Sequence, residues 1–100
     1  MRITYEITAT VSEELIGKYE GYMADRHVPD LLATGCFDSA SLSSSSPGRY
    51  RIRYEAPNRE SLDRYLANDA ERLRTDFAEH FPDDVSVERE VWEVRSEFKL

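Results

Sequence analysis

The chain has 100 residues and a formal net charge of -7, with 40% hydrophobic and 33% charged residues, which fits one folded domain over residues 1–100. The acidic balance argues against nucleic acid and against an anionic membrane surface as partners, because both bind clustered Lys and Arg. A single cysteine excludes an internal disulfide, and with no signal-peptide pattern and no apolar run as long as a membrane span we expect a cytoplasmic protein.

The first predicted element is a half-buried strand over residues 2–11, in which apolar and polar side chains alternate. Ser12 follows as a helix N-cap, and Glu13 and Glu14 lie in the first turn, where the helix dipole favours negative charge. Apolar residues at helical spacing then form one stripe along this helix. The stripe consists of Leu15, Tyr19, Tyr22 and Met23.

Pro29 predicts where this first helix ends. Val28 precedes it, and a residue before proline is disfavoured in the helical region, so the helix should end near His27. Pro29 can then open a short second turn over residues 30–34, which Gly35 terminates. We expect the next residue, Cys36, to be packed and unreactive, because no cationic neighbour is evident.

A weak strand is predicted over residues 36–45, and it ends in a run of serines followed by Pro47 and Gly48. Proline and glycine suit the two central positions of a type II turn. The serine run fits either the flexible end of a hairpin or a linker. The clear alternation of residues 49–56, directly after the turn, favours the hairpin.

Pro57 ends that strand, and Asn58 is predicted to cap a long helix that continues to Phe81. The apolar stripe of this helix is Leu62, Tyr65, Leu66, Ala70, Leu73, Phe77 and Phe81. After a turn at residues 82–84, the last strand runs from Val85 to Phe98. Its apolar residues stand at odd-numbered positions in the first part of the strand and at even-numbered positions in the second part. This change predicts either a bulge near Arg89 or a strand covered on both faces.

The order strand, helix, strand, strand, helix, strand is that of the ferredoxin-like βαββαβ unit, an α+β fold. Two right-handed crossovers place both helices on one face of a four-stranded antiparallel sheet, with the first and third strands in its centre. The face toward the helices should carry Ile3, Tyr5, Ile7, Ile52 and Tyr54.

The opposite face of the predicted sheet is polar and bears both signs of charge. It would carry Thr4, Glu6, Thr8, Arg49, Arg51, Arg53, Glu55 and part of the last strand with Trp92. Antiparallel sheets can expose such a face to water. The alternative is a second copy of the sheet packed against it around a polar cavity. Trp92 and Val94, apolar on the last strand, favour this homodimer.

His27 is the first candidate for chemistry, as a general acid or base beside a cavity mouth, with Asp30 as its partner in a dyad. The more ordinary interpretation, which we favour, is that His27 holds the helix corner and Asp30 caps the short turn. Glu6, Arg51 and Arg53 could bind a small anion beside Trp92, although we favour cross-strand ion pairing as the reason for these charged residues.

Several other classes of site leave no trace in the sequence. His80, at the end of the second long helix, is expected to be exposed to solvent. We find no zinc-binding spacing, phosphate loop, nucleophile elbow or dinucleotide fingerprint. The sequence therefore predicts neither a metal nor a cofactor.

The segment from Tyr22 to Phe37 also carries a resemblance. Its Tyr-Met pair, His27-Val-Pro-Asp30 run and Leu32-Ala-Thr-Gly35 run, followed by an aromatic residue, resemble a small bacterial family of unknown function. Further matching segments are Tyr50–Tyr54 and the helix with Tyr65-Leu66 and Ala70–Arg74. The chain departs from the pattern at Tyr22, where the family has Trp, and in the serine-rich hairpin.

The resemblance implies a fold similar to the ferredoxin-like dimeric α+β barrel proteins and no established activity. That superfamily includes cofactor-free monooxygenases, isomerases, dehydratases and haem-handling enzymes as well as binding modules, so the fold alone does not choose among them. We expect a homodimer that binds a small molecule between sheet and helices. The alternatives are a cofactor-independent enzyme using His27 and a structural or regulatory interaction module. A cavity containing His27 and Arg53 would favour the first two.

Overall fold

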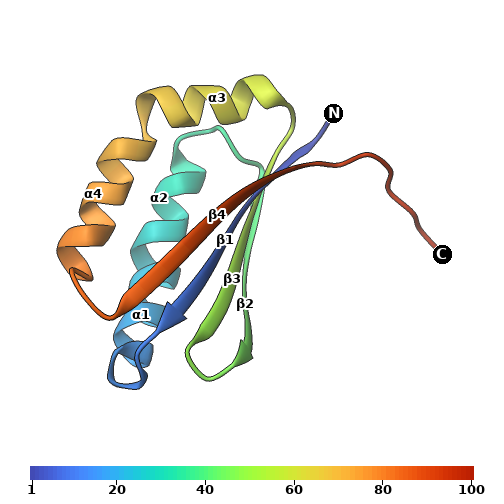
Figure 1. Cartoon of the computed structure of the whole chain (residues 1–100). Coiled ribbons are helices and arrows are strands. Elements are labelled where there is room, and N and C mark those ends of the chain that lie inside the picture. The colour runs from blue at the N-terminus through green and yellow to red at the C-terminus, as the bar shows by residue number, and fades with distance from the viewer.

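The computed structural model describes all 100 residues, and its elements follow the predicted order. They are β1 (Ile3–Val11), η1 (Glu13–Leu15), α1 (Ile16–Tyr22), η2 (Met23–His27), α2 (Val28–Ala33), β2 (Ser39–Ser46), β3 (Arg49–Ala56), α3 (Arg59–Asn68), α4 (Ala70–His80) and β4 (Val85–Glu93). The strands form one antiparallel sheet in the order β2-β3-β1-β4, and the helices form a layer on one of its faces (Figure 1). The ferredoxin-like prediction is confirmed. Every helix is too short or too polar to cross a bilayer.

The strand register confirms which side chains face the helices. Tyr5 of β1 pairs with Tyr54 of β3 and with Val91 of β4, and Ile7 pairs with Ile52. Directly paired residues project from the same face of a sheet. Ile52 and Tyr54 are at most 1% exposed, so the core lies between this face and the helices.

The last strand differs from its prediction in two ways. Its pairing with β1 is continuous from Val85 to Glu93, so a bulge near Arg89 is wrong for this chain. Arg89, opposite Ile7, therefore lies on the helix side of the sheet, and Trp92, opposite Thr4, lies on the open side. The strand also ends at Glu93, and residues 94–100 run away from the body of the molecule (Figure 1).

The first helix does not end at His27 as predicted. Val28 keeps helical angles, φ -64° and ψ -47°, and its N–H donates to the carbonyl of Met23, five residues earlier. This bond closes a wide π turn over Met23–His27, and Pro29, which has no N–H to offer, lies in the first turn of α2. The wide turn lets the chain continue as a helix through the proline, and it sets the direction of His27.

The serine run is a strand, as the hairpin hypothesis required, although β2 begins at Ser39 rather than at Cys36. Cys36 and Phe37 instead belong to the buried core. Gly48 has a φ of +80°, which fits the predicted turn, and its carbonyl accepts a 2.7 Å hydrogen bond from the N–H of Val11. The hairpin end is thereby attached to the end of β1.

The second long helix is divided in two at Asp69, where φ is -126° (Figure 1). Its predicted cap is confirmed, since the Asn58 side chain accepts from the N–H of Ser61 at 2.9 Å. Asn and Asp side chains compete with the helix backbone for hydrogen bonds, which explains a break after Asn68. Tyr65 before the break and Leu73 after it are both buried, so the bend keeps both halves packed on the core.

Candidate functional site

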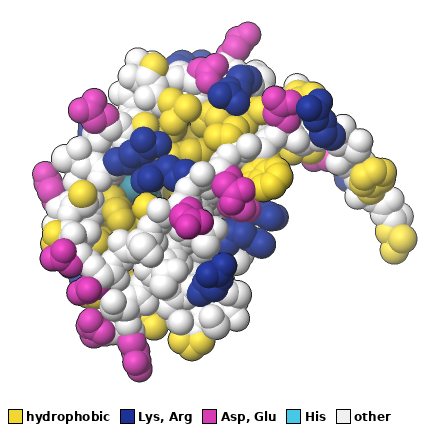
Figure 2. Space-filling model, viewed as in Figure 1, with side chains coloured by type: hydrophobic (Ala, Val, Ile, Leu, Met, Phe, Trp, Pro, Cys, Tyr) yellow, Lys and Arg dark blue, Asp and Glu magenta, His cyan; other side chains and the backbone are white.

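A cavity of about 40 Å³ lies between the sheet and the helices. This is room for roughly three water molecules. Its wall is mostly hydrophobic, with Ile7 and Ile52 from the sheet and Leu31 and Phe77 from the helices. The remaining lining residues are Tyr5, Tyr19, Met23, His27, Tyr54, Tyr65, Arg74, Val87 and Arg89. Figure 2 shows basic side chains gathered between α4 and β4, with a histidine visible beside them.

Tyr54 reaches the cavity from the central strand β3. Its side chain is 1% exposed, and its hydroxyl has no hydrogen-bond partner in the protein. Burial, together with neighbouring tyrosines, raises the pKa of Tyr54 well above its usual range, so the hydroxyl stays protonated. A buried polar group without a partner costs about 1–3 kcal/mol. Tyr54 therefore has an unused hydrogen-bond donor and lines the cavity.

His27 reaches the same cavity from the wide turn of η2. Its ring lies 5.7 Å from that of Tyr22 and 5.6 Å from that of Phe77, and its buried Nδ1 has no hydrogen-bond partner. Burial lowers the pKa of His27 to about 4, against the opposing charges of Asp30 and Asp76. The imidazole is consequently neutral at neutral pH, with one nitrogen that donates and one that accepts.

Two arginines complete the lining, Arg74 from α4 and Arg89 from β4. Arg74 donates from Nη2 to the Tyr5 hydroxyl at 2.9 Å, and neither guanidinium forms a salt bridge. No Asp or Glu lines the cavity. The site thus combines an apolar wall, two unpartnered polar atoms and two unneutralised positive charges.

The predicted site residues are divided between the two faces of the sheet. His27 lies at the cavity, and Asp30, half-buried on α2, makes no hydrogen bond to it and acts on it only through its charge. Glu6, Arg51, Arg53 and Trp92 lie on the open face instead. There Arg53 pairs with Glu6 across the strands at 2.5 Å, as the ion-pair interpretation predicted.

Sequence reasoning missed Arg74, Arg89 and the free hydroxyl of Tyr54. Tyr54 was predicted only as a core residue, because periodicity shows burial and not whether a hydroxyl finds a partner. Arg89 did leave a signal in the sequence. It lies between Val87 and Val91 at every second position of the last strand, so all three side chains lie on the face toward the helices. The direction of Arg74 depends on the bend at Asp69, which the pattern of a straight helix does not contain.

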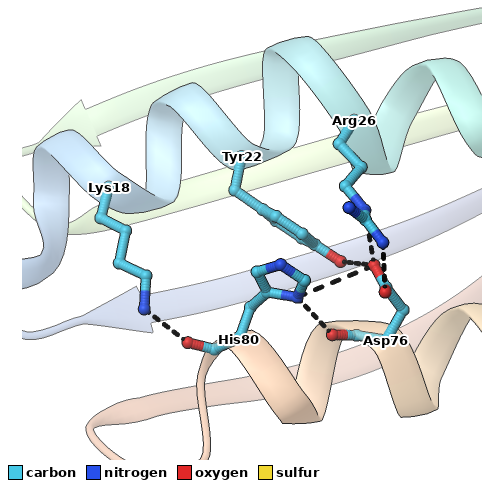
Figure 3. Close-up of polar contacts among 5 residues, drawn as sticks. All are labelled: Lys18, Tyr22, Arg26, Asp76 and His80. Atoms are coloured by element: carbon cyan, nitrogen blue, oxygen red, sulfur yellow. Dashed lines mark hydrogen bonds and ion pairs between the residues drawn. The ribbon is translucent and has the colours of Figure 1, made fainter.

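A polar cluster beside the cavity ties α4 to α1 and η2 (Figure 3). The Asp76 carboxylate accepts from the Tyr22 hydroxyl at 2.7 Å and from Arg26 at 2.6 and 3.0 Å, which lowers the pKa of Asp76. Lys18 donates to the carbonyl of His80 at 2.7 Å. His80 is half-buried with its ring 4.5 Å from that of Tyr22, so it is more enclosed than predicted. The cluster holds the helices that frame the cavity.

Metal-binding groups do not gather anywhere in the fold: no three His, Cys, Asp or Glu side chains are placed to hold an ion together. The polar groups among the cavity lining are hydroxyl, imidazole and guanidinium groups.

Comparison with known proteins gives one family and several similar folds. Residues 2–95 match the family model of a domain of unknown function, DUF4286. No curated protein matches the sequence. Similar solved structures include SnoaB, a cofactor-independent oxygenase from Streptomyces nogalater, with a TM-score of 0.77, 15% identity, and coverage of 96% of this chain and 95% of that one.

A dimeric ferredoxin-like protein from an uncultured marine organism has a TM-score of 0.75 and 12% identity, with each chain covered over 100% of its length. A protein from Deinococcus radiodurans, described as a candidate antibiotic biosynthesis monooxygenase, has a TM-score of 0.68 and 20% identity, covering 100% of this chain and 98% of that one. At these identities the likeness concerns the fold alone.

Proposed function

This chain belongs to the DUF4286 family, and we propose that it is a homodimeric protein that binds a small molecule between its sheet and its helices. The observation that carries the proposal is the pair of orphaned polar atoms. The Tyr54 hydroxyl and His27 Nδ1 are both buried, both lack a partner, and both residues line the same cavity. Apolar pockets with a few converging polar groups are typical of ligand sites.

The cavity is smaller than most organic ligands, so binding requires side chains at its edge to move. Arg74 and Arg89 are exposed residues with long, flexible side chains, and they are the members of the lining that can swing into solvent. The apolar wall behind them is held by β-sheet and helix packing. We therefore expect the ligand to enter between α4 and β4.

Replacing Tyr54 by Phe tests the binding function. The change removes an unpartnered hydroxyl, so the free energy of unfolding should stay within about 1 kcal/mol of wild type or rise. Binding of small organic fragments, followed by NMR shifts of cavity residues, should weaken because a donor is lost.

Tyr50→Phe is the matched control, since the Tyr50 hydroxyl bonds to Glu20 and lies outside the cavity lining. That variant should lose about 1 kcal/mol of stability and keep fragment binding. Unchanged fragment binding by Tyr54→Phe, or no fragment binding by wild type, would contradict the proposal.

A cofactor-independent enzyme using His27 is the second candidate. Its support is a neutral imidazole in the cavity wall, and SnoaB, which shares the fold, is described as a cofactor-independent oxygenase. A base whose pKa is near 4 abstracts only acidic protons efficiently. Binding is therefore the better-supported function, and catalytic roles for His27 and Asp30 stay predictions. The cavity contains His27 but not Arg53, so it has one of the two expected residues, and its presence weighs against a plain interaction module.

The open face of the sheet supports the homodimer. Trp92 is 54% exposed there, Arg49 and Arg51 of β3 have no salt-bridge partner, and Glu88 and Glu90 of β4 have none either. A two-fold axis parallel to the strands would place the acidic β4 of one copy over the half of its partner's sheet that carries the arginines. This face therefore has both an apolar anchor and complementary charge.

Light scattering at micromolar concentration tests the dimer. Wild type should have about twice the monomer mass of 11.6 kDa. Trp92→Glu should shift it to monomer, because a charge would be buried against the partner sheet. Leu66→Glu, at a similarly exposed apolar position on α3, should leave the dimer intact. A monomeric wild type would contradict the proposed interface, and a cytoplasmic location stays a separate prediction.

A further inference from the structure

The arginines of this chain differ in whether they are neutralised. Six of the eleven form salt bridges with carboxylates, and they are Arg2, Arg26, Arg53, Arg59, Arg72 and Arg95. The chain has 20 acidic residues, so carboxylates are not scarce. Arg74 and Arg89 nevertheless converge on one cavity without a carboxylate. Two positive charges therefore lie at the edge of this cavity without a carboxylate, which leaves them free to bind an anion from outside.

The rest of the lining narrows the kind of anion. The wall is formed mostly by apolar and aromatic side chains, which accept a hydrocarbon body rather than a hydrated inorganic ion. Arg74 uses one nitrogen, Nη2, on Tyr5, and Arg89 makes no side-chain hydrogen bond, so both forks keep N–H groups free to bind a carboxylate. Beyond the arginines, the Tyr54 hydroxyl can donate one further bond inside the cavity.

We infer that the ligand is a small organic carboxylate, with its acid group bound by Arg74 and Arg89, its apolar body inserted between sheet and helices, and an acceptor atom on that body bound by the Tyr54 hydroxyl; this rests on the proposed binding function. In this arrangement the acid group of the ligand lies at the edge where α4 meets β4, and its hydrocarbon part packs against Ile52 and Leu31. Charge-assisted hydrogen bonds to two guanidinium groups supply the specificity for an acid over a neutral molecule of the same shape.

Matched pairs of acids and amides test the inference directly. Benzoate with benzamide, and hexanoate with hexanamide, have nearly the same shape and differ in charge. In NMR titrations of wild type, each acid should bind at least about tenfold more tightly than its amide. Raising NaCl from 50 to 500 mM should weaken binding of the acids and leave the amides unchanged, because screening acts on the charge alone.

Arg74→Gln and Arg89→Gln should each reduce the affinity for the acids toward that of the amides. Arg64→Gln is the control, since Arg64 is an exposed arginine of α3 that has no salt bridge and does not line the cavity. It should leave both affinities unchanged. Circular dichroism of each variant verifies folding, and the salt dependence of wild type tests the charge without any substitution.

The outcomes separate the two proposals. If amides bind as tightly as acids, the carboxylate inference is wrong and the binding function stands. If inorganic phosphate competes as well as benzoate, the apolar body is not recognised, and the inference is wrong in that part. If neither acids nor amides bind, both the inference and the proposed function are overturned.

Discussion

Lowering the pH from 6.5 to 4 is expected to destabilise the wild-type protein by up to about 3 kcal/mol through His27 alone. Burial lowers the pKa of this imidazole from an ordinary 6.5 to about 4. Between these two values the unfolded chain binds a proton that the native state does not bind. The free energy of unfolding therefore falls as the pH is lowered through this window, and the His27 contribution stops falling below about pH 4.

The groups facing His27 support this direction. Asp30 and Asp76 favour the charged imidazole, Arg89 opposes it, and burial outweighs the carboxylates. The Asp76 and Asp38 carboxyl groups have lowered pKa values of their own, so they stabilise the fold above their ordinary pKa near 4 and lose this effect mainly at lower pH. These two carboxyl groups therefore contribute little to the change in stability between pH 6.5 and 4.5.

Urea unfolding of His27→Asn across this window is the measurement. At pH 7.5 the free energy of unfolding of the variant should lie within about 1 kcal/mol of the wild-type value. Between pH 6.5 and 4.5 the variant should not show the decrease in this free energy that wild type shows. His80→Asn, which replaces the half-exposed histidine outside the cavity lining, should keep the wild-type slope. A His27→Asn variant with the full wild-type slope would show that His27 is not buried at the cavity as described.

Replacing Gly48 by Ala is expected to cost about 2–4 kcal/mol of stability. The φ of +80° is unfavourable for a residue with a Cβ, and a Cβ at this position would lie 2.5 Å from the backbone carbonyl oxygen of Val11. The 2.7 Å bond from the Val11 N–H to the Gly48 carbonyl prevents the two segments from simply separating. Relief of the clash would pull the hairpin end away from β1.

Gly21→Ala is the matched control for that experiment. Gly21 lies in α1, and a Cβ there would meet nothing within 4 Å. The same substitution should therefore raise stability by roughly 0.5–1 kcal/mol, because alanine is the better helix former. Thermal unfolding of the two variants should give shifts of opposite sign. A Gly48→Ala variant as stable as wild type would contradict the described turn.

Local chemistry was sufficient to predict most of the fold. The alternation in residues 2–11 and 49–56 assigned Tyr5, Ile52 and Tyr54 to the helix side, because successive side chains of a strand point to opposite faces. Pro47-Gly48 and Asn58 predicted a turn and a cap correctly, since each acts within a few residues of itself. The unlike charges of Glu6 and Arg53 predicted their ion pair once the strands were adjacent.

Features that depend on distant packing were beyond the sequence. Pro29 predicted a helix end, yet the π turn ending at His27 carries the helix onward and leaves the imidazole facing the sheet. Sequence reasoning placed a possible anion site at Arg51 and Arg53 of β3, with Glu6, on the open face of the sheet. The bend at Asp69 and the unbroken register of β4 decide which arginines reach the cavity. They bring Arg74 of α4 and Arg89 of β4 to the cavity from opposite sides.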